Sequence, residues 1–82
     1  MNKRDEVSNP ESCWNRAKDD EMCFVLLARD ITAPSVIRFW IAERLRTGKN
    51  TAGDPQIAHA LECIRTMEEQ QRRSKKHVHP ST

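Results

Sequence analysis

Four polar side chains near the middle of the chain have the types and spacing of an anion-binding site. Arg29 and Asp30 directly follow an apolar stretch, and Ser35 and Arg38 come soon after, one helical turn apart. A helix that begins here directs its free N–H groups and the positive end of its dipole toward the same corner. Arginine holds phosphate through two parallel hydrogen bonds. We therefore expect these four residues to bind a phosphorylated small ligand.

Two tryptophans flank this corner and have flat rings on which a base can stack. Trp14 lies before the apolar stretch together with Lys18, and Trp40 lies after it. We add Trp14 and Lys18 to the expected ligand-binding residues. The commoner roles of such residues are structural. In that alternative Asp30 caps a helix, Arg38 pairs with Asp30 or another acid, and the tryptophans lie in a core or an interface.

The sequence does not favour a metal site or a catalytic centre. Its candidate metal ligands lack the short paired spacing of a structural zinc site; they are Cys13, Cys23, Cys63, His59, His77 and His79. A nucleophilic cysteine needs a positioned base, and His59 is the only histidine before the C-terminal tail. The acidic residues 19–21 could raise one another's pKa, but a helix stop followed by a cap also explains them. We expect no enzyme, no metal and no cofactor.

Helix signals dominate the elements that must position these residues. Ser8 and Glu11 have the spacing of a capping box, which predicts a short first helix over about 10–19. Asp20 can cap a second short helix over about 21–29.

The apolar run from Met22 to Ala28 has no polar face. A helix of this kind should be buried on most sides. A buried strand over 22–29 is the alternative, because periodicity does not distinguish the two for so short a run. We favour the helix because no convincing second strand exists to pair with it. An isolated buried strand would leave its backbone polar groups unsatisfied.

Two longer helices follow. Thr32 or Asp30 can cap the third helix, and Gly48 marks its end. Asp54, followed by a proline, can cap the fourth, which should continue past Gln71. Apolar residues recur at helical spacing in both, namely Val36, Ile37, Trp40, Ile41 and Leu45, then Ile57, Ala60, Leu61, Ile64 and Met67. The fourth helix also offers acid–base pairs on its outer face, Glu62–Arg65, Glu68–Arg72 and Glu69–Arg73.

Length and composition place this pattern in one small all-α domain. The chain has 82 residues and a formal net charge of +2. We expect 1–7 to be a disordered lead, 8–71 a single helical domain and 72–82 a basic flexible tail. So short a domain barely offsets its own chain entropy, and oligomerisation often supplies the missing burial. The expected fold is a small bundle of about four helices, two short and two long, completed by a homo-oligomer.

Charge and cysteine content bear on location and partners. The basic residues of the tail lie close together without interleaved aromatics, a weak footprint for nucleic acid; they are Arg72, Arg73, Lys75 and Lys76. We therefore do not expect nucleic acid to be the main partner. No apolar stretch is long enough to span a membrane, and the odd number of cysteines argues against a disulfide framework. We expect a cytoplasmic protein without membrane contact.

The central stretch resembles small phage and prophage proteins with the pattern C-[LW]-x-K-A-x-x-D-E-P-x-F-V-L-x-A-x-D-x-x-A-P-x-x-V-R-x-W. The matching positions are Cys13, Trp14, Ala17, Asp20, Glu21, Phe24, Val25, Leu26, Ala28, Asp30, Ala33, Pro34, Arg38 and Trp40. This sequence departs from the pattern at Arg16, Met22 and Ile37. The resemblance covers about a third of the chain and implies a phage origin, without an assigned activity.

A small helical protein without evident catalytic residues is most simply a binding protein. Our sharper hypothesis is a counter-defence protein that sequesters a nucleotide-derived immune signal at a subunit interface. A cyclic nucleotide or an ADP-ribose derivative would be its ligand. The first alternative is an inhibitor that binds a host or CRISPR-type defence protein through the acidic 19–21 corner or an exposed aromatic patch. The second is a nucleic-acid-binding accessory protein that uses the basic tail.

Overall fold

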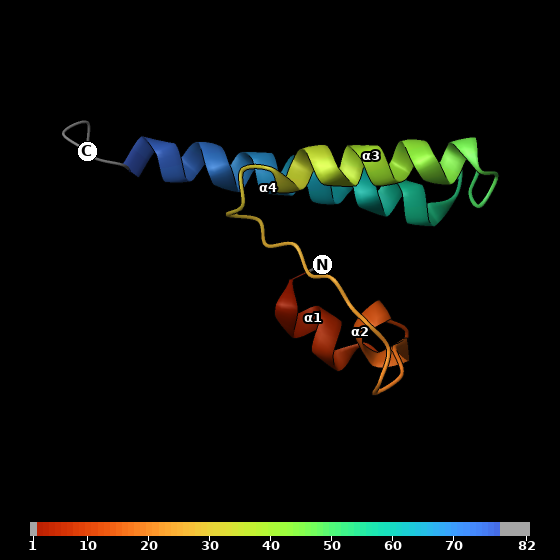
Figure 1. Cartoon of the computed structure of the whole chain (residues 1–82). Coiled ribbons are helices and arrows are strands. Elements are labelled where there is room, and N and C mark those ends of the chain that lie inside the picture. Colours follow the sequence, from red (N-terminus) through yellow and green to blue (C-terminus); the bar gives the residue numbers. More distant parts are fainter. Residues whose placement is uncertain (1, 78–82) are drawn as a thin grey trace.

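The chain is helical, and the computed structural model describes its residues 2–77. Its helices are α1 (Lys3–Ser8), α2 (Cys13–Arg16), α3 (Ala33–Arg46) and α4 (Pro55–His77), and no strand occurs within the described range. Figure 1 shows two parts joined by an extended connection. In one part α3 and α4 lie side by side as a hairpin, and in the other α1 packs against α2. The predicted all-α class is confirmed.

A narrow line of isoleucines holds the hairpin together. Ile41 of α3 packs with Ile57 and Ile64 of α4, and both of these α4 side chains are only 3% exposed. Ile37 and Ala60 pack against this line and are partly buried. The apolar stripes predicted in the two long helices therefore face each other. Only the centre of each stripe is buried, and its borders remain open to solvent.

Local hydrogen bonds fix the connection between the two long helices. α3 ends as predicted before Gly48, whose φ of 74° is a left-handed conformation that glycine adopts without steric cost. The Lys49 N–H then donates to the Arg44 carbonyl at 3.0 Å and satisfies a free carbonyl of the last turn. Asp54 accepts from the Thr51 N–H at 3.0 Å and from the Thr51 hydroxyl at 2.8 Å. Its carboxylate thus orders the loop directly ahead of α4.

A cluster of polar contacts joins α1 to α2. Ser12 is buried, and its hydroxyl donates to the Glu6 carbonyl and accepts from the Asn15 N–H. The Asn15 side-chain amide lies 2.8 Å from the carbonyls of Val7 and Asn9, to which it donates. Among the described helices, neither α1 nor α2 contacts α3 or α4. These hydrogen bonds are therefore the main link within this part of the chain.

The helix predicted over 10–19 is shorter than expected and begins later. Ser12 caps it, and the helical residues are those of α2 alone. Ser8, the predicted cap, instead ends α1, a helix that occupies the stretch expected to be a disordered lead. The difference has a physical reason. The buried Ser12 hydroxyl donates to the Glu6 carbonyl of α1 while it caps α2 by accepting from the Asn15 N–H, whereas Ser8 is exposed.

The helix predicted over 21–29 is absent. The chain instead runs as the extended connection of Figure 1 and turns only near its end, where the Asp30 N–H donates to the Leu27 carbonyl at 3.0 Å. Met22 is 94% exposed and Phe24 is 84% exposed, so the predicted burial is also wrong for this chain by itself. A helix that is apolar all round needs neighbours on every side, and the hairpin supplies none.

The two short predicted helices therefore do not join the two long ones in a bundle within one chain. The radius of gyration is 14.9 Å, against about 12 Å for a compact domain of this length. The length of α4, which has 23 residues, and the separation of the α1–α2 part from the hairpin both contribute to this excess (Figure 1).

α4 extends beyond Gln71, as its acid–base pairs predict. The predicted pair Glu69–Arg73 is present at 3.3 Å, and the pair of Glu62 with Arg65 is also formed. Arg72 bonds to Glu69 at 2.7 Å in place of its predicted partner. The helix thus enters the stretch 72–82 that was expected to be a flexible tail. Residues 78–82 of that stretch lie outside the described residues.

Candidate functional site

Asp30 forms a closed turn with Thr32 immediately before α3. Its carboxylate accepts from the Thr32 N–H at 2.9 Å and from the Thr32 hydroxyl at 2.6 Å. The hydroxyl contact, followed by the backbone contact, holds the pKa of Asp30 below its ordinary value. An ionised carboxylate that is already engaged in this way repels an anionic ligand. Asp30 therefore fits the structural alternative, in which it organises the start of the helix.

Arg38 links the two helices of the hairpin. Its Nη2 atom lies 2.7 Å from Oε2 of Glu68, and its side chain remains 53% exposed. Because this carboxylate offsets its charge, Arg38 attracts phosphate less than an unpaired guanidinium would. The ion pair also fits the structural alternative, in which Arg38 pairs with an acid. That acid is Glu68, which the sequence analysis had paired with Arg72. Sequence spacing could not reveal this partner, since the contact depends on how α3 and α4 align.

The other expected site residues lie in separate places. Trp14 is exposed on α2, where its backbone N–H donates to the Glu6 carboxylate at 3.3 Å. Lys18 follows that helix, Arg29 is exposed in the turn before α3, and Ser35 is exposed in the first turn of α3. Because α2 and α3 do not contact each other, the structure does not bring Trp14 together with Ser35 in a single site.

Gln71 is a positioning residue that the sequence analysis missed. Its side-chain amide donates to the Ala28 carbonyl at 2.9 Å and to the Asp30 carbonyl at 3.0 Å. These bonds tie the turn before α3 to the far end of the hairpin. One signal was available, because Gln71 continues the seven-residue spacing of Ile57 and Ile64 and so lies on the inner side of α4. A glutamine at such a position has to find polar partners.

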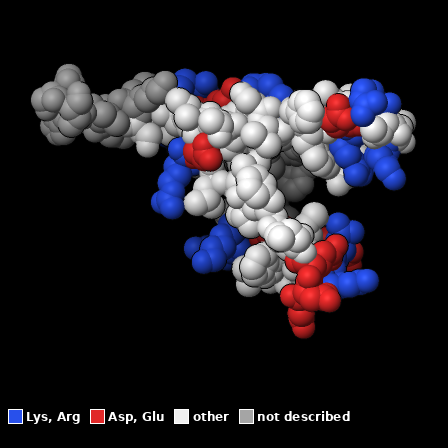
Figure 2. All heavy atoms as spheres, in the orientation of Figure 1, with Lys and Arg blue, Asp and Glu red and all other residues white. Residues whose placement is uncertain are grey.

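The apolar segment, Met22–Ala28, is the most exposed apolar stretch among the described residues. Besides Met22 and Phe24, the side chains of Val25 and Leu27 are half exposed or more. Figure 2 shows uncharged atoms over the connection that contains this segment, while charged side chains lie on the α1–α2 part and on the hairpin. Contiguous apolar surface on a soluble protein marks a site of interaction.

The outer face of α3, formed by Val36, Phe39 and Trp40, is a second exposed apolar surface. Val36 and Trp40 are border residues of the stripe predicted in α3, and they are 42% and 37% exposed. Phe39 lies beyond that border and is 68% exposed. The guanidinium of Arg44 lies 5.3 Å from the centre of the Trp40 ring, a cation–π contact that covers part of the indole. Phe39 is therefore the most exposed side chain of this face.

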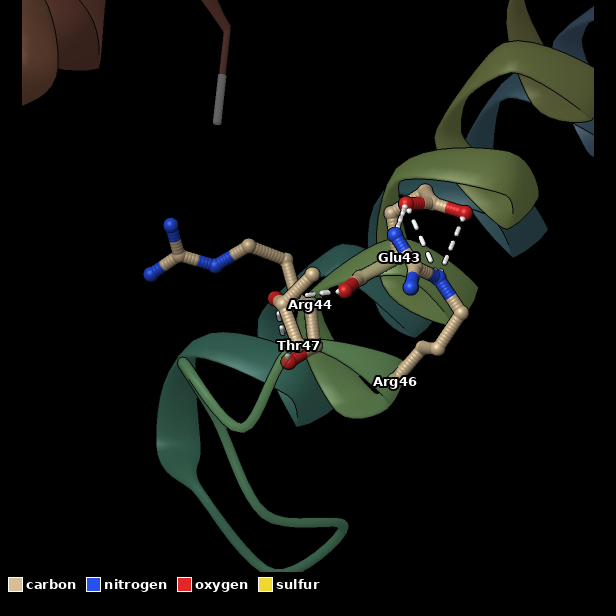
Figure 3. A network of polar contacts seen from close by, with 4 residues as sticks. All are labelled: Glu43, Arg44, Arg46 and Thr47. Atoms are coloured by element: carbon tan, nitrogen blue, oxygen red, sulfur yellow. Dashed lines mark hydrogen bonds and ion pairs between the residues drawn. The ribbon is translucent and has the colours of Figure 1, made fainter.

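Charged and polar residues surround the loop end of this face. In Figure 3 the carboxylate of Glu43 accepts from the Arg46 guanidinium, with a shortest distance of 2.6 Å, and this contact raises the pKa of Arg46. The Thr47 hydroxyl donates to the Glu43 carbonyl at 2.7 Å. Arg44 points away from this pair (Figure 3) and donates to Asn50 of the loop at 2.6 Å. These contacts stabilise the helix end and form a polar border to the apolar face.

Several other kinds of site receive no support from the described part of the chain. No three histidine, cysteine or acidic side chains within it gather as metal ligands would. Cys13 and Cys23 are exposed, and Cys63 is half-buried. Arg72 and Arg73, part of the basic patch, both bond to Glu69 and lower its pKa, chiefly through the Arg72 hydrogen bond. None of the described helices combines the length and apolar character needed to cross a bilayer.

Comparisons with protein-family models, with curated proteins and with solved structures found no match to this chain. Its function must therefore follow from its own contacts, exposure and charge. Two surfaces stand out on those grounds, the apolar segment and the outer face of α3. Both are apolar and large, and neither has the convergent polar groups of a small-molecule pocket.

Proposed function

We propose that this chain is a non-enzymatic protein-binding module that acts as a homo-oligomer. The observation that carries the proposal is the outer face of α3, where Phe39 is exposed between Val36 and Trp40. Large aromatic side chains held on a rigid element are typical hot spots of protein interfaces. Soluble proteins rarely leave such a stripe uncovered without a partner. The outer face of α3 is therefore the proposed contact surface.

The surroundings of this face support a protein as the partner. The isoleucine line fixes α3 against α4, and Arg44 lies against the Trp40 ring. The Glu43–Arg46 pair lies one turn further along the helix. An apolar centre with a charged border is the usual anatomy of a protein interface. A groove that accepts one face of a helix, with side chains three and four positions apart, would fit it.

The resemblance of residues 13–40 to phage proteins indicates the class of partner. A phage protein of this size that binds another protein would act on a host or defence component. An inhibitor of a host or defence protein was the first alternative raised from the sequence. We take the exposed aromatic patch of that alternative to be the outer face of α3. The acidic residues 19–21 are also exposed and would serve as a secondary contact.

Sequestration of a nucleotide-derived signal has less support. Arg38 is paired with Glu68, and Asp30 is engaged by Thr32. Trp14 is carried by a helix that does not contact α3. A nucleotide site built from these residues would need a second chain to complete it. We therefore place protein binding first and keep the nucleotide hypothesis as an outcome of the test.

The test is site-specific photo-crosslinking of the full chain in host cells. A benzophenone amino acid at position 39 should yield one discrete adduct with a host protein. The matched control carries it at position 61, because Leu61 is an exposed apolar residue of α4 that is 48% exposed. The host protein found in the adduct should also co-purify with the unmodified chain. It should still co-purify with the Leu61→Ser variant and no longer with the Phe39→Ser variant.

Two results would overturn this proposal. Equal adducts at both positions, or none at either, would remove the outer face of α3 as the contact surface. Thermal stabilisation of the chain by one nucleotide of a panel, lost in Arg38→Ala, would instead support sequestration.

We also propose that a second copy of the chain completes the fold. Among the described residues the buried apolar side chains of the hairpin are few, chiefly Ile41, Ile57 and Ile64. A core of this size rarely stabilises a domain without further burial. Light scattering of the full chain should give at least twice the mass of one chain. A well-folded monomer at micromolar concentration would refute it.

A further inference from the structure

We infer that the apolar segment, Met22–Ala28, pairs with the same segment of a second copy as two antiparallel strands centred on Val25. The inference rests on the homo-oligomer proposed above and names the surface through which it forms. Three observations carry it: the unbonded backbone of the segment, the charges at its two ends, and its exposed apolar area.

The backbone of the segment offers a free strand edge. The N–H groups from Met22 to Arg29 donate no hydrogen bond within the described part of the chain. Phenylalanine and valine, which lie at its centre, are residues that strands favour. The carbonyls of Leu27 and Ala28 already accept hydrogen bonds, from the Asp30 N–H and the Gln71 side-chain amide, so the open part of the edge precedes Leu27. An unpaired row of N–H and C=O groups is a template for pairing with another chain. Leu26 and Ala28 are already half-buried, so the segment has some support from its own chain.

The charges that border the segment select a second copy and an orientation. Asp19, Asp20 and Glu21 precede it, and Arg29 and then Asp30 follow it. Antiparallel pairing with an identical segment places Glu21 of each copy beside Arg29 of the other. It also places Asp20 beside Asp30, whose carboxylate already accepts hydrogen bonds from Thr32. Parallel pairing would place the two acidic ends together, and like charges on neighbouring strands are destabilising. A two-fold axis also repeats each contact, so the dimer would contain two Glu21–Arg29 pairs.

Symmetry restricts the register of such a pair. Along antiparallel strands, directly opposed residues alternate between hydrogen-bonded and non-hydrogen-bonded pairs. A two-fold axis maps hydrogen-bonded pairs onto hydrogen-bonded pairs and non-hydrogen-bonded pairs onto non-hydrogen-bonded pairs. The axis must therefore pass through a pair in which a residue faces the same residue of the second copy. Centring on Val25 keeps apolar residues opposite apolar ones and sets Glu21 opposite Arg29. Moving the centre to Phe24 sets Glu21 opposite Leu27, although Arg29 then faces Asp19. Moving it to Leu26 sets Glu21 opposite Ile31 and Arg29 opposite Cys23.

Exposed apolar side chains line the segment and would be partly covered by pairing. Met22, Phe24, Val25 and Leu27 are each half exposed or more, and Ile31 is exposed just beyond the segment. An aromatic side chain buries about 150–250 Å² when it is fully covered. Directly opposed side chains on paired strands lie within contact distance, so each copy would cover part of the exposed area of the other.

Disulfide trapping tests the register directly. The full chain is prepared with alanine at the three native cysteine positions and with Val25→Cys. Residues that face each other across antiparallel strands have Cα atoms about 4.5–5.5 Å apart, within the range that a disulfide spans. Mild oxidation should therefore convert most of this variant to a covalent dimer. The matched control is Phe24→Cys, whose two copies would lie roughly 8 Å apart, beyond disulfide reach.

Charge exchange is the second measurement. Arg29→Glu should raise the dimer dissociation constant by about tenfold, because two exposed ion pairs are replaced by repulsion. Adding Glu21→Arg to that variant should restore most of the affinity.

The outcomes separate this inference from the proposals on which it depends. A dimer that crosslinks as well at position 24 as at 25, or that is not restored by the charge exchange, overturns the strand pairing but leaves the homo-oligomer standing. A monomer at all concentrations overturns both. Neither result affects the proposed contact of Phe39 with a host protein, which its own crosslinking tests.

Discussion

Ile64→Ala should be among the most damaging single substitutions in this chain. Ile64 is 3% exposed and packs with Ile41 and Ile57 in the line that holds the hairpin. Truncating a buried isoleucine to alanine costs about 2–5 kcal/mol. A domain of this length has only about 4–12 kcal/mol of total stability. The variant should therefore lose a large share of its stability and be partly unfolded near 37 °C.

Urea unfolding followed by far-ultraviolet circular dichroism measures the loss. Protein concentration must be held constant, because assembly with a second copy would make the midpoint depend on it. Leu61→Ala is the matched control, on the same helix but 48% exposed. Its loss should be well below half that of Ile64→Ala, since less apolar area returns to water. Equal losses in the two variants would mean that the isoleucine line is not the core of the hairpin.

Three further predictions concern the backbone and the polar contacts. Gly48→Ala should cost about 1–2 kcal/mol, because φ at this position is 74°, whereas Gly53→Ala should be neutral or stabilising in the same urea titration. Gln71→Ala should speed tryptic cleavage in the turn before α3, whose carbonyls Gln71 holds, and Gln70→Ala should leave the cleavage rate unchanged. Asp54 has a lowered pKa through hydrogen bonds from Asn50 and then Thr51, so its contribution to stability is present above the unfolded value of about 3.9 and is lost as pH falls through the folded pKa. Asp54→Asn should therefore flatten the fall in urea midpoint below pH 4.

The two long helices could be predicted from the sequence because local signals and apolar spacing agree there. Gly48 ends α3 where a left-handed residue was expected, and the isoleucines of α3 and α4 meet along the predicted stripes. The short helices failed because their signals compete. Ser8 and Ser12 are both good caps, and only the contact of Ser12 with α1 decides between them.

The expected ligand site depended on contacts that local sequence does not encode. Glu68 was equally well placed to pair with Arg72 on its own helix and with Arg38 on the other, and the alignment of the hairpin favours Arg38. Gln71 reaches the turn before α3 for the same reason. Contacts between distant parts of a chain need the fold before they can be named, whereas the Asp30–Thr32 turn lies within three residues and was foreseeable.

The apolar segment marks the point at which sequence reasoning and the single chain diverge most. Its composition indicates burial, and that inference does not depend on whether the covering surface belongs to the same chain. A strand was set aside because the chain offers no convincing second strand, yet an identical segment in a second copy would supply one. The charges of Glu21 and Arg29 make the segment complementary to itself when it is reversed. A disulfide-linked dimer of Val25→Cys would show that the predicted burial of this segment is correct and that a second copy, not the same chain, covers it.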